Sequence, residues 1–277
     1  MIEYPIYIIS KGRYDVKRKM TWDFLKDENI DFVLIVEPSE AKEYEKITEN
    51  LLVLPKDNYG TSIYARMYAL EDSLKKGYSH HFLLDDNMKN IVVLWKGRRY
   101  TTKISYLLKS LNIVSKMYED VLIYGFQEYQ FLLGVNVPIS FNNHIYSFFL
   151  IDNTIYEKGI HWRLKYNEDV DICLQTIAKG YFTAQIRLFS FHKYVTREIK
   201  GGNTDTLYKG RNSKVLKTNI LKAYYPNIVK VDNRFGRYHH VISWQKFPKI
   251  PKKKLEYERW KSELISLYRQ AVSEVKV

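Results

Sequence analysis

The stretch His81-Phe82-Leu83-Leu84-Asp85-Asp86-Asn87 decides the fold, because a short apolar run is followed at once by three polar side chains. An apolar run of this length predicts a buried β-strand. In an α/β sheet the residues directly after such a strand lie at the carboxyl edge, where ligands bind. The same polar residues could also form an ordinary turn or a helix cap, so their meaning depends on the rest of the chain.

Similar apolar runs alternate with helical patterns through the first two thirds of the chain. This alternation predicts an α/β sheet covered by helices. Strands are expected at 6–10, 32–36, 51–54 and 81–84, helices at 17–28, 61–76 and 102–119, and further β segments at 121–132 and 144–151.

The composition changes after about Thr196, where Gly201-Gly202-Asn203 is followed by scattered Lys and Arg and by a helical pattern over 255–272. We therefore expect two units. The first covers residues 1–196, and the second is a basic C-terminal extension, residues 197–277.

The chain has 277 residues, a formal net charge of +13 and a single cysteine, Cys173. No apolar run reaches the roughly 18 to 20 residues that span a bilayer, so we predict no membrane span. One cysteine rules out an internal disulfide and suits a reducing cytoplasm, and we expect Cys173 to be a small core residue. The positive charge favours a polyanionic partner, whether a nucleotide sugar, a nucleic acid or an acidic membrane surface.

Oxygen ligands suited to a divalent cation follow the strand expected at 81–84. Asp85 and Asn87, two positions apart, could both reach one ion. The run 188–193 ends in His192, which could complete the metal shell. A lone histidine at a strand end is more often a structural or surface residue.

A second acidic segment, Asn167-Glu168-Asp169-Val170-Asp171, opens an amphipathic helical pattern. It offers a carboxylate at a helix N-terminus, where the helix dipole favours negative charge. Read by itself, the segment is equally a capping cluster.

Two basic positions could hold phosphate oxygens. The loop Ser10-Lys11-Gly12-Arg13 follows the first strand, and it has neither the Walker nor the dinucleotide spacing. Arg66, in the second turn of the helix expected from 61, could pair with a diphosphate or a carboxylate. A solvated turn and a surface arginine are the alternatives.

Taken in order, these pieces resemble the GT-A glycosyltransferases, and more narrowly the TET-associated DNA glycosyltransferases of bacteriophages, which are related to the base J glucosyltransferase. The similar stretch runs from about Tyr4 to Lys193. It rests on Ile8-Ile9-Ser10-Lys11-Gly12-Arg13, the segment 60–66, Leu83-Leu84-Asp85-Asp86-Asn87, Asn167-Glu168-Asp169 and Phe191-His192-Lys193.

The resemblance implies a GT-A fold in residues 1–196 and a UDP-sugar donor held with Mn²⁺ or Mg²⁺. Asp85 and Asn87 would match the metal-binding DXD motif, with Asn where many relatives have a second Asp, and Asp86 would lie near the ribose or sugar. His192 would bind the metal or the diphosphate. Ser10, Lys11, Gly12, Arg13 and Arg66 would belong to the donor site.

For the chemistry, the resemblance implies that Asp169 is the general base, with Glu168 as its neighbour. The implied acceptor is the hydroxyl of 5-hydroxymethylcytosine or 5-hydroxymethyluracil in DNA, modified in the cytoplasm of the host cell.

The extension could supply the DNA contacts. Its basic residues Lys209, Arg211, Lys214, Lys217, Arg234, Arg237 and Lys246 could track phosphates, and its aromatic residues Tyr224, Tyr225, Phe235, Tyr238 and Trp244 could stack on bases or simply form core. A protein or glycan acceptor, or an inactive relative that only binds DNA, are the competing interpretations.

Overall fold

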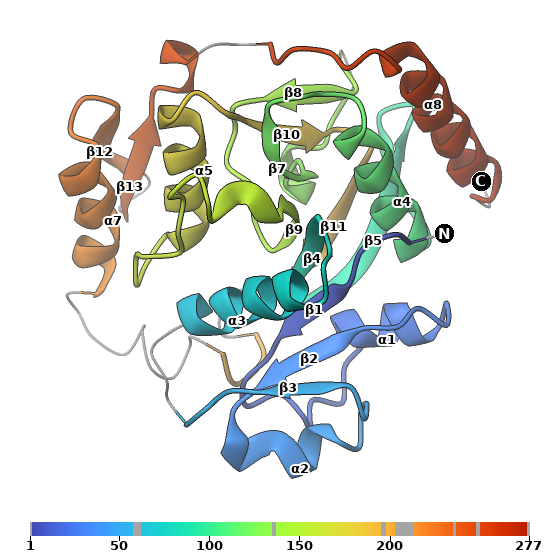
Figure 1. The fold of residues 1–277 in the computed structure, drawn as a ribbon, viewed down its shortest axis with the longest axis vertical. Helices are drawn as coiled ribbons and strands as arrows, with labels where there is room; N and C mark the ends of the chain where they lie inside the picture. The colour runs from blue at the N-terminus through green and yellow to red at the C-terminus, as the bar shows by residue number, and fades with distance from the viewer. Residues whose placement is uncertain are drawn as a thin grey trace.

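The computed structural model describes residues 2–57, 62–134, 137–194, 198–202, 213–234, 237–247 and 250–275. Its centre is a sheet of eight strands, and Figure 1 shows helices on both faces. The predicted α/β class, a mixed sheet flanked by helices, is therefore confirmed.

Parallel and antiparallel strands are combined in the main sheet. Strands β3, β2, β1 and β4 run parallel, β9 is antiparallel to both β4 and β7, β10 is parallel to β7, and β8 pairs antiparallel at the edge. In sheet order the strands are β3 (Leu51–Val53), β2 (Val33–Val36), β1 (Ile6–Ile9), β4 (His80–Asp85), β9 (Phe148–Asp152), β7 (Val121–Phe126), β10 (Phe182–Ile186) and β8 (Ile139–Phe141).

The side chains of β1 and β4 alternate between two apolar cores, as expected for strands covered on both faces. On one face, Tyr7 and Leu83 pack with α3 (Ser62–Lys75) and α5 (Glu168–Ala178). On the other face, Ile8 and Phe82 pack with α1 (Thr21–Lys26) and α4 (Ile104–Ser115). The short helix α2 (Ala41–Tyr44) follows β2.

A second, antiparallel sheet lies over the α4 face, in the order β11-β5-β6. Its strands are β5 (Met88–Trp95), β6 (Arg98–Thr101) and β11 (Phe189–Lys193). Because β5 begins directly after Asn87 and β11 ends at Lys193, the pairing of these strands brings Lys193 back to the end of β4.

The described residues after 202 lie on two sides of the sheet (Figure 1). Helix α7 (Ser213–Tyr224) and the hairpin of β12 (Val229–Arg234) and β13 (Arg237–Ile242) share a small core with α5. Arg163 and Tyr225 both bind the buried carboxylate of Asp171, with hydrogen bonds of 2.7 to 3.0 Å.

Helix α8 (Tyr257–Ser273) packs on α4 at the other side (Figure 1). Its buried side chains, Leu264 and Ala271, belong to the same core as β1 and α4. Tyr106 of α4 also hydrogen-bonds Glu274, one residue beyond the end of α8.

Three sequence predictions were too long. The helix expected over 17–28 begins at Thr21, whose backbone N–H donates to Asp86 O at 2.9 Å, and the basic residues at 17–19 would have faced the positive end of its dipole. The β segment 121–132 ends at Phe126. The segment 144–151 becomes a strand only at Phe148, because Ser147 has a φ of 57°.

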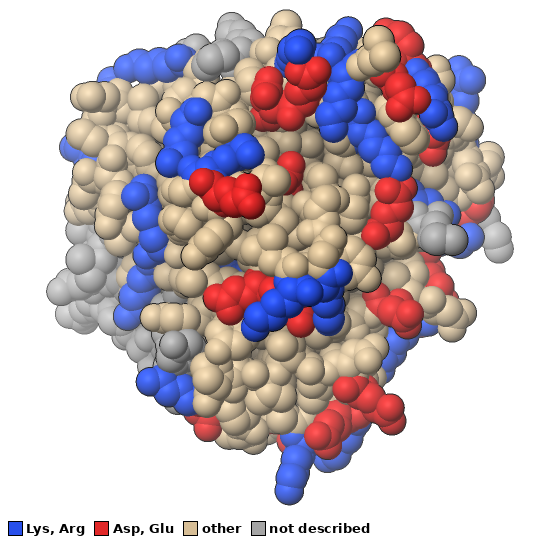
Figure 2. Space-filling view, viewed as in Figure 1, with Lys and Arg blue, Asp and Glu red and all other residues tan. Residues whose placement is uncertain are grey.

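Cys173 is fully buried, as predicted. Within the described ranges, no helix is both long and apolar enough to cross a membrane. Figure 2 shows Lys and Arg side chains spread over one face of the molecule and interspersed with Asp and Glu, rather than gathered into one patch.

Gly125 of β7 provides a test of the packing. A Cβ atom there would lie 2.2 Å from Ile145 Cγ2 and 2.7 Å from Phe148 O. We expect Gly125→Ala to lower the free energy of unfolding by about 1 to 3 kcal/mol, because the crowded backbone must shift. Urea denaturation measures this change.

Gly134→Ala is the matched control, since a Cβ there would meet nothing within 4 Å. It should change the free energy of unfolding by less than about 0.5 kcal/mol. Equal stability of the two variants would contradict this packing of β7.

Candidate active site

The predicted site residues lie at one edge of the sheet because parallel strands end together. β1 and β4 pair in parallel with Ile9 opposite Asp85, so the next residues, Ser10 and Asp86, leave the sheet side by side. The N-terminal ends of α3 and α5 lie at this edge too, where Ser62 Oγ donates to Glu168 Oε1 at 2.7 Å. The edge therefore collects residues from four elements.

Asp86 is the buried centre of the first cluster, with 2% of its surface exposed. It accepts a hydrogen bond from Ser10 Oγ at 2.6 Å and forms an ion pair with Arg13. Burial raises the pKa of Asp86 above its usual value, and the Arg13 guanidinium opposes that shift. The structure thus brings together three residues predicted for the donor site, with Tyr44 OH 2.6 Å from Ser10 Oγ.

Hydrogen bonds connect the loop of residues 10–13 to residues 200–202. Gly202 N donates to Lys11 O at 2.8 Å, and Arg13 Nε donates to Lys200 O at 3.0 Å. Gly12 has a φ of 64°, and a Cβ at Gly201 would lie 2.5 Å from Gly12 O. This close approach of two backbones requires glycine.

Acidic side chains also contact the loop. Lys11 Nζ pairs with Glu37 Oε1 at 2.7 Å, and Gly12 N donates to Glu40 Oε2 at 2.8 Å. The loop is therefore already engaged by carboxylates, which a phosphate would have to replace or join.

Asp85 is the centre of the second cluster and lies between two cations. Its Oδ1 is 3.3 Å from Arg66 Nη2, and its Oδ2 is 3.3 Å from Lys193 Nζ. Burial alone would raise the pKa of Asp85, but the Lys193 ammonium and the Arg66 guanidinium outweigh it and hold that pKa below its usual value. Lys193 also donates to Ser147 Oγ.

Arg66 links this cluster to α5. Its side chain is 5% exposed, and Nη2 lies 3.7 Å from Glu168 Oε1. The guanidinium carbon lies 4.8 Å from the centre of the Trp162 ring, a cation–π contact. Within the described part of the chain, Arg66 Nε and Nη1 have no hydrogen-bond partner, so two buried donors are available at the site.

Asp169 lies beside Glu168 in the first turn of α5 and is partly exposed. Burial first, and then the negative charge of Glu168, raises the pKa of Asp169 to about 6. A carboxylate with a raised pKa is a stronger base than an ordinary aspartate. The predicted pair Glu168 and Asp169 thus lies next to Arg66.

The predicted metal ligands are not brought together in the same way. The His192 ring stacks on Tyr129, with ring centres 4.3 Å apart and planes 3° from parallel, and Lys193 rather than His192 reaches Asp85. Asn87 Nδ2 donates to Tyr194 O at 3.4 Å, while its buried Oδ1 has no partner among the described residues.

Both oxygens of Asp85 face cations, so this arrangement does not fit the expected Mn²⁺ or Mg²⁺ shell. Across the described ranges, no three His, Cys, Asp or Glu side chains form a group that could hold a metal ion. Metal binding by Asp85, Asn87 and His192 stays a prediction.

Lys193 and Ser147 were missed at the sequence level. His192 was chosen at the end of its strand, but neighbouring strand residues point to opposite sides, so choosing the histidine meant overlooking the lysine. A short polar residue before the apolar run 148–151 was the available signal for Ser147.

The C-terminal residues predicted to contact DNA have mixed surroundings. Tyr224 and Tyr238 are more than half exposed, Tyr225 binds Asp171, Trp244 lies against His144, and Lys246 Nζ donates to Asn227 O at 3.0 Å. Lys209, Arg211 and Phe235 lie outside the described residues, as do the side chains of Lys214, Lys217, Arg234 and Arg237.

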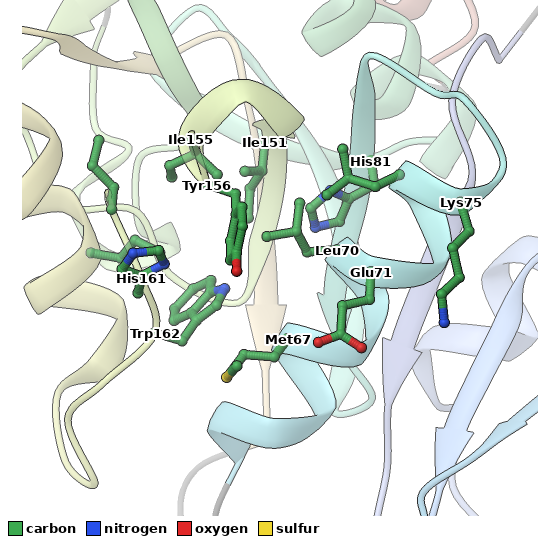
Figure 3. A pocket seen from close by; sticks show the side chains of 13 residues that line it. Met67, Leu70, Glu71, Lys75, His81, Ile151, Ile155, Tyr156, His161 and Trp162 are labelled. Carbon is green, nitrogen blue, oxygen red and sulfur yellow. The ribbon is translucent and has the colours of Figure 1, made fainter. Parts of the chain in front are cut away.

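A largely apolar cavity of about 430 Å³ lies between α3 and the segment 151–162 (Figure 3). Met67, Leu70 and Trp162 line it, and Trp162 also contacts Arg66. His81 lines the cavity too; burial lowers its pKa to about 4, so its ring is neutral at pH 7. The cavity does not include the carboxylates of the edge, so it is not the candidate active site.

Arg66 gives a testable prediction about the edge. Arg66→Met leaves Asp85 and Glu168 without their shared cation, and we expect a loss of about 3 kcal/mol in the free energy of unfolding. Arg259→Met is the control, because its ion pair with Glu256 is exposed and should contribute less than about 1 kcal/mol. Similar urea midpoints for both variants would contradict the buried pairing.

The family model described as TET-Associated Glycosyltransferase matches residues 4–202. No curated protein matches the chain. Among solved structures, a mannose-1-phosphate geranyltransferase from Thermus thermophilus is similar at 11% identity and a TM-score of 0.31, over 68% of this chain and 58% of that one. Such a remote likeness bears on neither substrate nor mechanism. The family match covers well over half of the chain, and the chain therefore belongs to the TET-associated glycosyltransferase family.

Proposed function

We propose that the protein transfers a sugar from a UDP-sugar to the hydroxyl of 5-hydroxymethylcytosine or 5-hydroxymethyluracil in DNA. The observation that carries this proposal is Asp169, a partly exposed carboxylate whose pKa is raised to about 6 at the edge where Arg66 and Asp85 meet. A base next to buried cations is what sugar transfer from a diphosphate requires.

Asp169 is the general base of the proposed reaction. It accepts the proton of the acceptor hydroxyl while that oxygen forms a bond to the anomeric carbon of the sugar. The bond from the anomeric carbon to the diphosphate oxygen breaks, and UDP leaves with the electron pair. Glu168 is held by Ser62 and Arg66, so Asp169 is the carboxylate of the pair that is left to act.

Positive side chains of the edge would stabilise the departing diphosphate. Two nitrogens of the Arg66 guanidinium, Nε and Nη1, have no hydrogen-bond partner among the described residues. Lys193 pairs with Asp85, the carboxylate that Arg66 also contacts. Preorganised cations stabilise charge that develops in the transition state, because they need not reorient as the bond breaks. Arg13, beside Asp86, would face the nucleotide part of the donor.

A modified base in DNA is the proposed acceptor. Family membership supports this choice, as does the net charge of +13, which attracts a polyanion. The 5-substituent of a pyrimidine projects into the major groove, but a base inside a duplex cannot easily bring its hydroxyl to Asp169 at the edge of the sheet. An unpaired or flipped-out nucleotide would solve this access problem.

Mass spectrometry of nucleosides tests the reaction directly. Hydroxymethylated DNA is incubated with the protein, Mn²⁺ and a panel of UDP-sugars, then digested. We expect a mass gain the size of a hexose or an N-acetylhexosamine, and replacing Mn²⁺ with EDTA tests the predicted metal requirement. UDP release without a DNA product would redirect the search to protein or glycan acceptors, and no donor interaction at all would refute the proposal.

Asp169→Asn should lower turnover by about 10² to 10⁴, the usual contribution of a general base, while UDP binding is retained. In the wild type, turnover should rise with pH through about 6 and level off above it, because the base acts when deprotonated.

The rise in turnover near pH 6 should be absent from the residual activity of Asp169→Asn. Asp31→Asn, at an exposed carboxylate, should behave like the wild type. Full activity of Asp169→Asn would rule out this base.

A further inference from the structure

A surface outside the C-terminal residues predicted to contact DNA combines exposed apolar side chains with cations that have no acidic partner among the described residues. It forms where the β5–β6 turn meets the segment after β7. A Cβ at Gly97 would lie 3.8 Å from Leu133 O, and Arg99 Nη1 donates to Tyr129 O at 2.7 Å. We call Lys96, Arg98, Arg99, Phe131 and Leu133 the hairpin surface.

The apolar side chains of the hairpin surface, Phe131 and Leu133, are largely exposed rather than packed in the core. Leu132 is fully buried and packs with Val92 and Leu94, which anchors the segment. Its neighbours Phe131 and Leu133 point outward and are 60% and 64% exposed. An aromatic ring left in water beside an anchored residue is available to a ligand.

Its cations lack acidic partners. Lys96 and Arg98 are exposed, and no described carboxylate forms an ion pair with Lys96, Arg98 or Arg99. What Lys96 and Arg99 contact instead is aromatic: Lys96 Nζ lies 5.4 Å from the Trp95 ring centre, and the Arg99 guanidinium lies 4.3 Å from that of Tyr129. The surface is therefore positive and aromatic together.

A stack of side chains runs from this surface to β11, the strand whose last residue lies at the candidate active site. Arg99 covers Tyr129, Tyr129 stacks on His192, and the residue after His192 is Lys193, which pairs with Asp85. His192 thus has a place in the structure that involves no metal. The stack therefore connects the hairpin surface to β11 one residue before Lys193.

We propose that the hairpin surface binds an unpaired stretch of the DNA strand that carries the target base. Phosphates would meet Lys96 and Arg98, and an unstacked base would lie on Phe131, because every base offers a flat face to an aromatic ring. This inference rests on the proposed function, since it takes the acceptor to be DNA.

Fluorescence anisotropy with labelled oligodeoxythymidine of about 12 nucleotides tests the proposal, with Kd measured over a range of salt. We expect Phe131→Ala to weaken binding by about 5- to 100-fold. It should not change the salt slope, which is the slope of log Kd against the logarithm of the salt concentration. The double variant Lys96→Gln/Arg98→Gln should lower that slope by about 1.4, or roughly 0.7 for each phosphate of a single strand that is no longer neutralised.

The double variant Lys252→Gln/Arg259→Gln is the matched control, because it removes the same charge from exposed positions near α8. It should leave the salt slope unchanged. An equal loss of slope in this control, or unchanged binding by Phe131→Ala, would overturn the inference. All these side chains are exposed, and equal melting temperatures would show that the variants fold.

Failure of this inference differs from failure of the proposed function. If the wild type glycosylates modified DNA and the hairpin variants bind and react as it does, the inference fails and the function stands. If the hairpin variants lose oligonucleotide binding but no sugar is ever transferred, the inference stands and the function fails.

Discussion

The arrangement of the candidate active site depends on one electrostatic constraint: the carboxylate at the end of β4 needs a positive partner. Asp85 obtains two, Arg66 from α3 and Lys193 from β11, and Arg66 is shared with Glu168 of α5. Leaving a buried charge unpaired costs several kcal/mol, so these four elements are fixed relative to one another. The position of Asp169, next to Glu168, follows from the same pairing.

This constraint also gives two adjacent acids different surroundings. Glu168 binds Ser62 and Arg66, whereas Asp169 accepts a hydrogen bond from Val170 N, and burial and the negative charge of Glu168 raise its pKa to about 6. Neighbouring carboxylates in different surroundings are a common way to provide one structural acid and one base. At the sequence level the family resemblance, rather than the residues Glu168-Asp169 themselves, singled out Asp169 as the expected base.

Sequence patterns predicted the elements whose signal is local. The apolar run before Asp85 and the acidic start of α5 both lie where expected, because buried strands and acidic first turns of helices leave clear marks in the chain. Lys193 and Tyr129 could not be found this way, since their positions depend on the pairing of β11 with β5 and on a turn after β7. A β segment expected to run to Leu132 hid that turn, and with it the exposed Phe131.

The family match ends at residue 202, yet the apolar interior does not. Tyr118 bridges to Lys253 just before α8, and Leu264 and Ala271 of α8 share a core with α4 and β1. A chain cut where the family resemblance stops would leave the outer side of α4 bare, and a bare apolar helix face invites aggregation. The apolar core of this chain therefore extends beyond the segment that the family model matches.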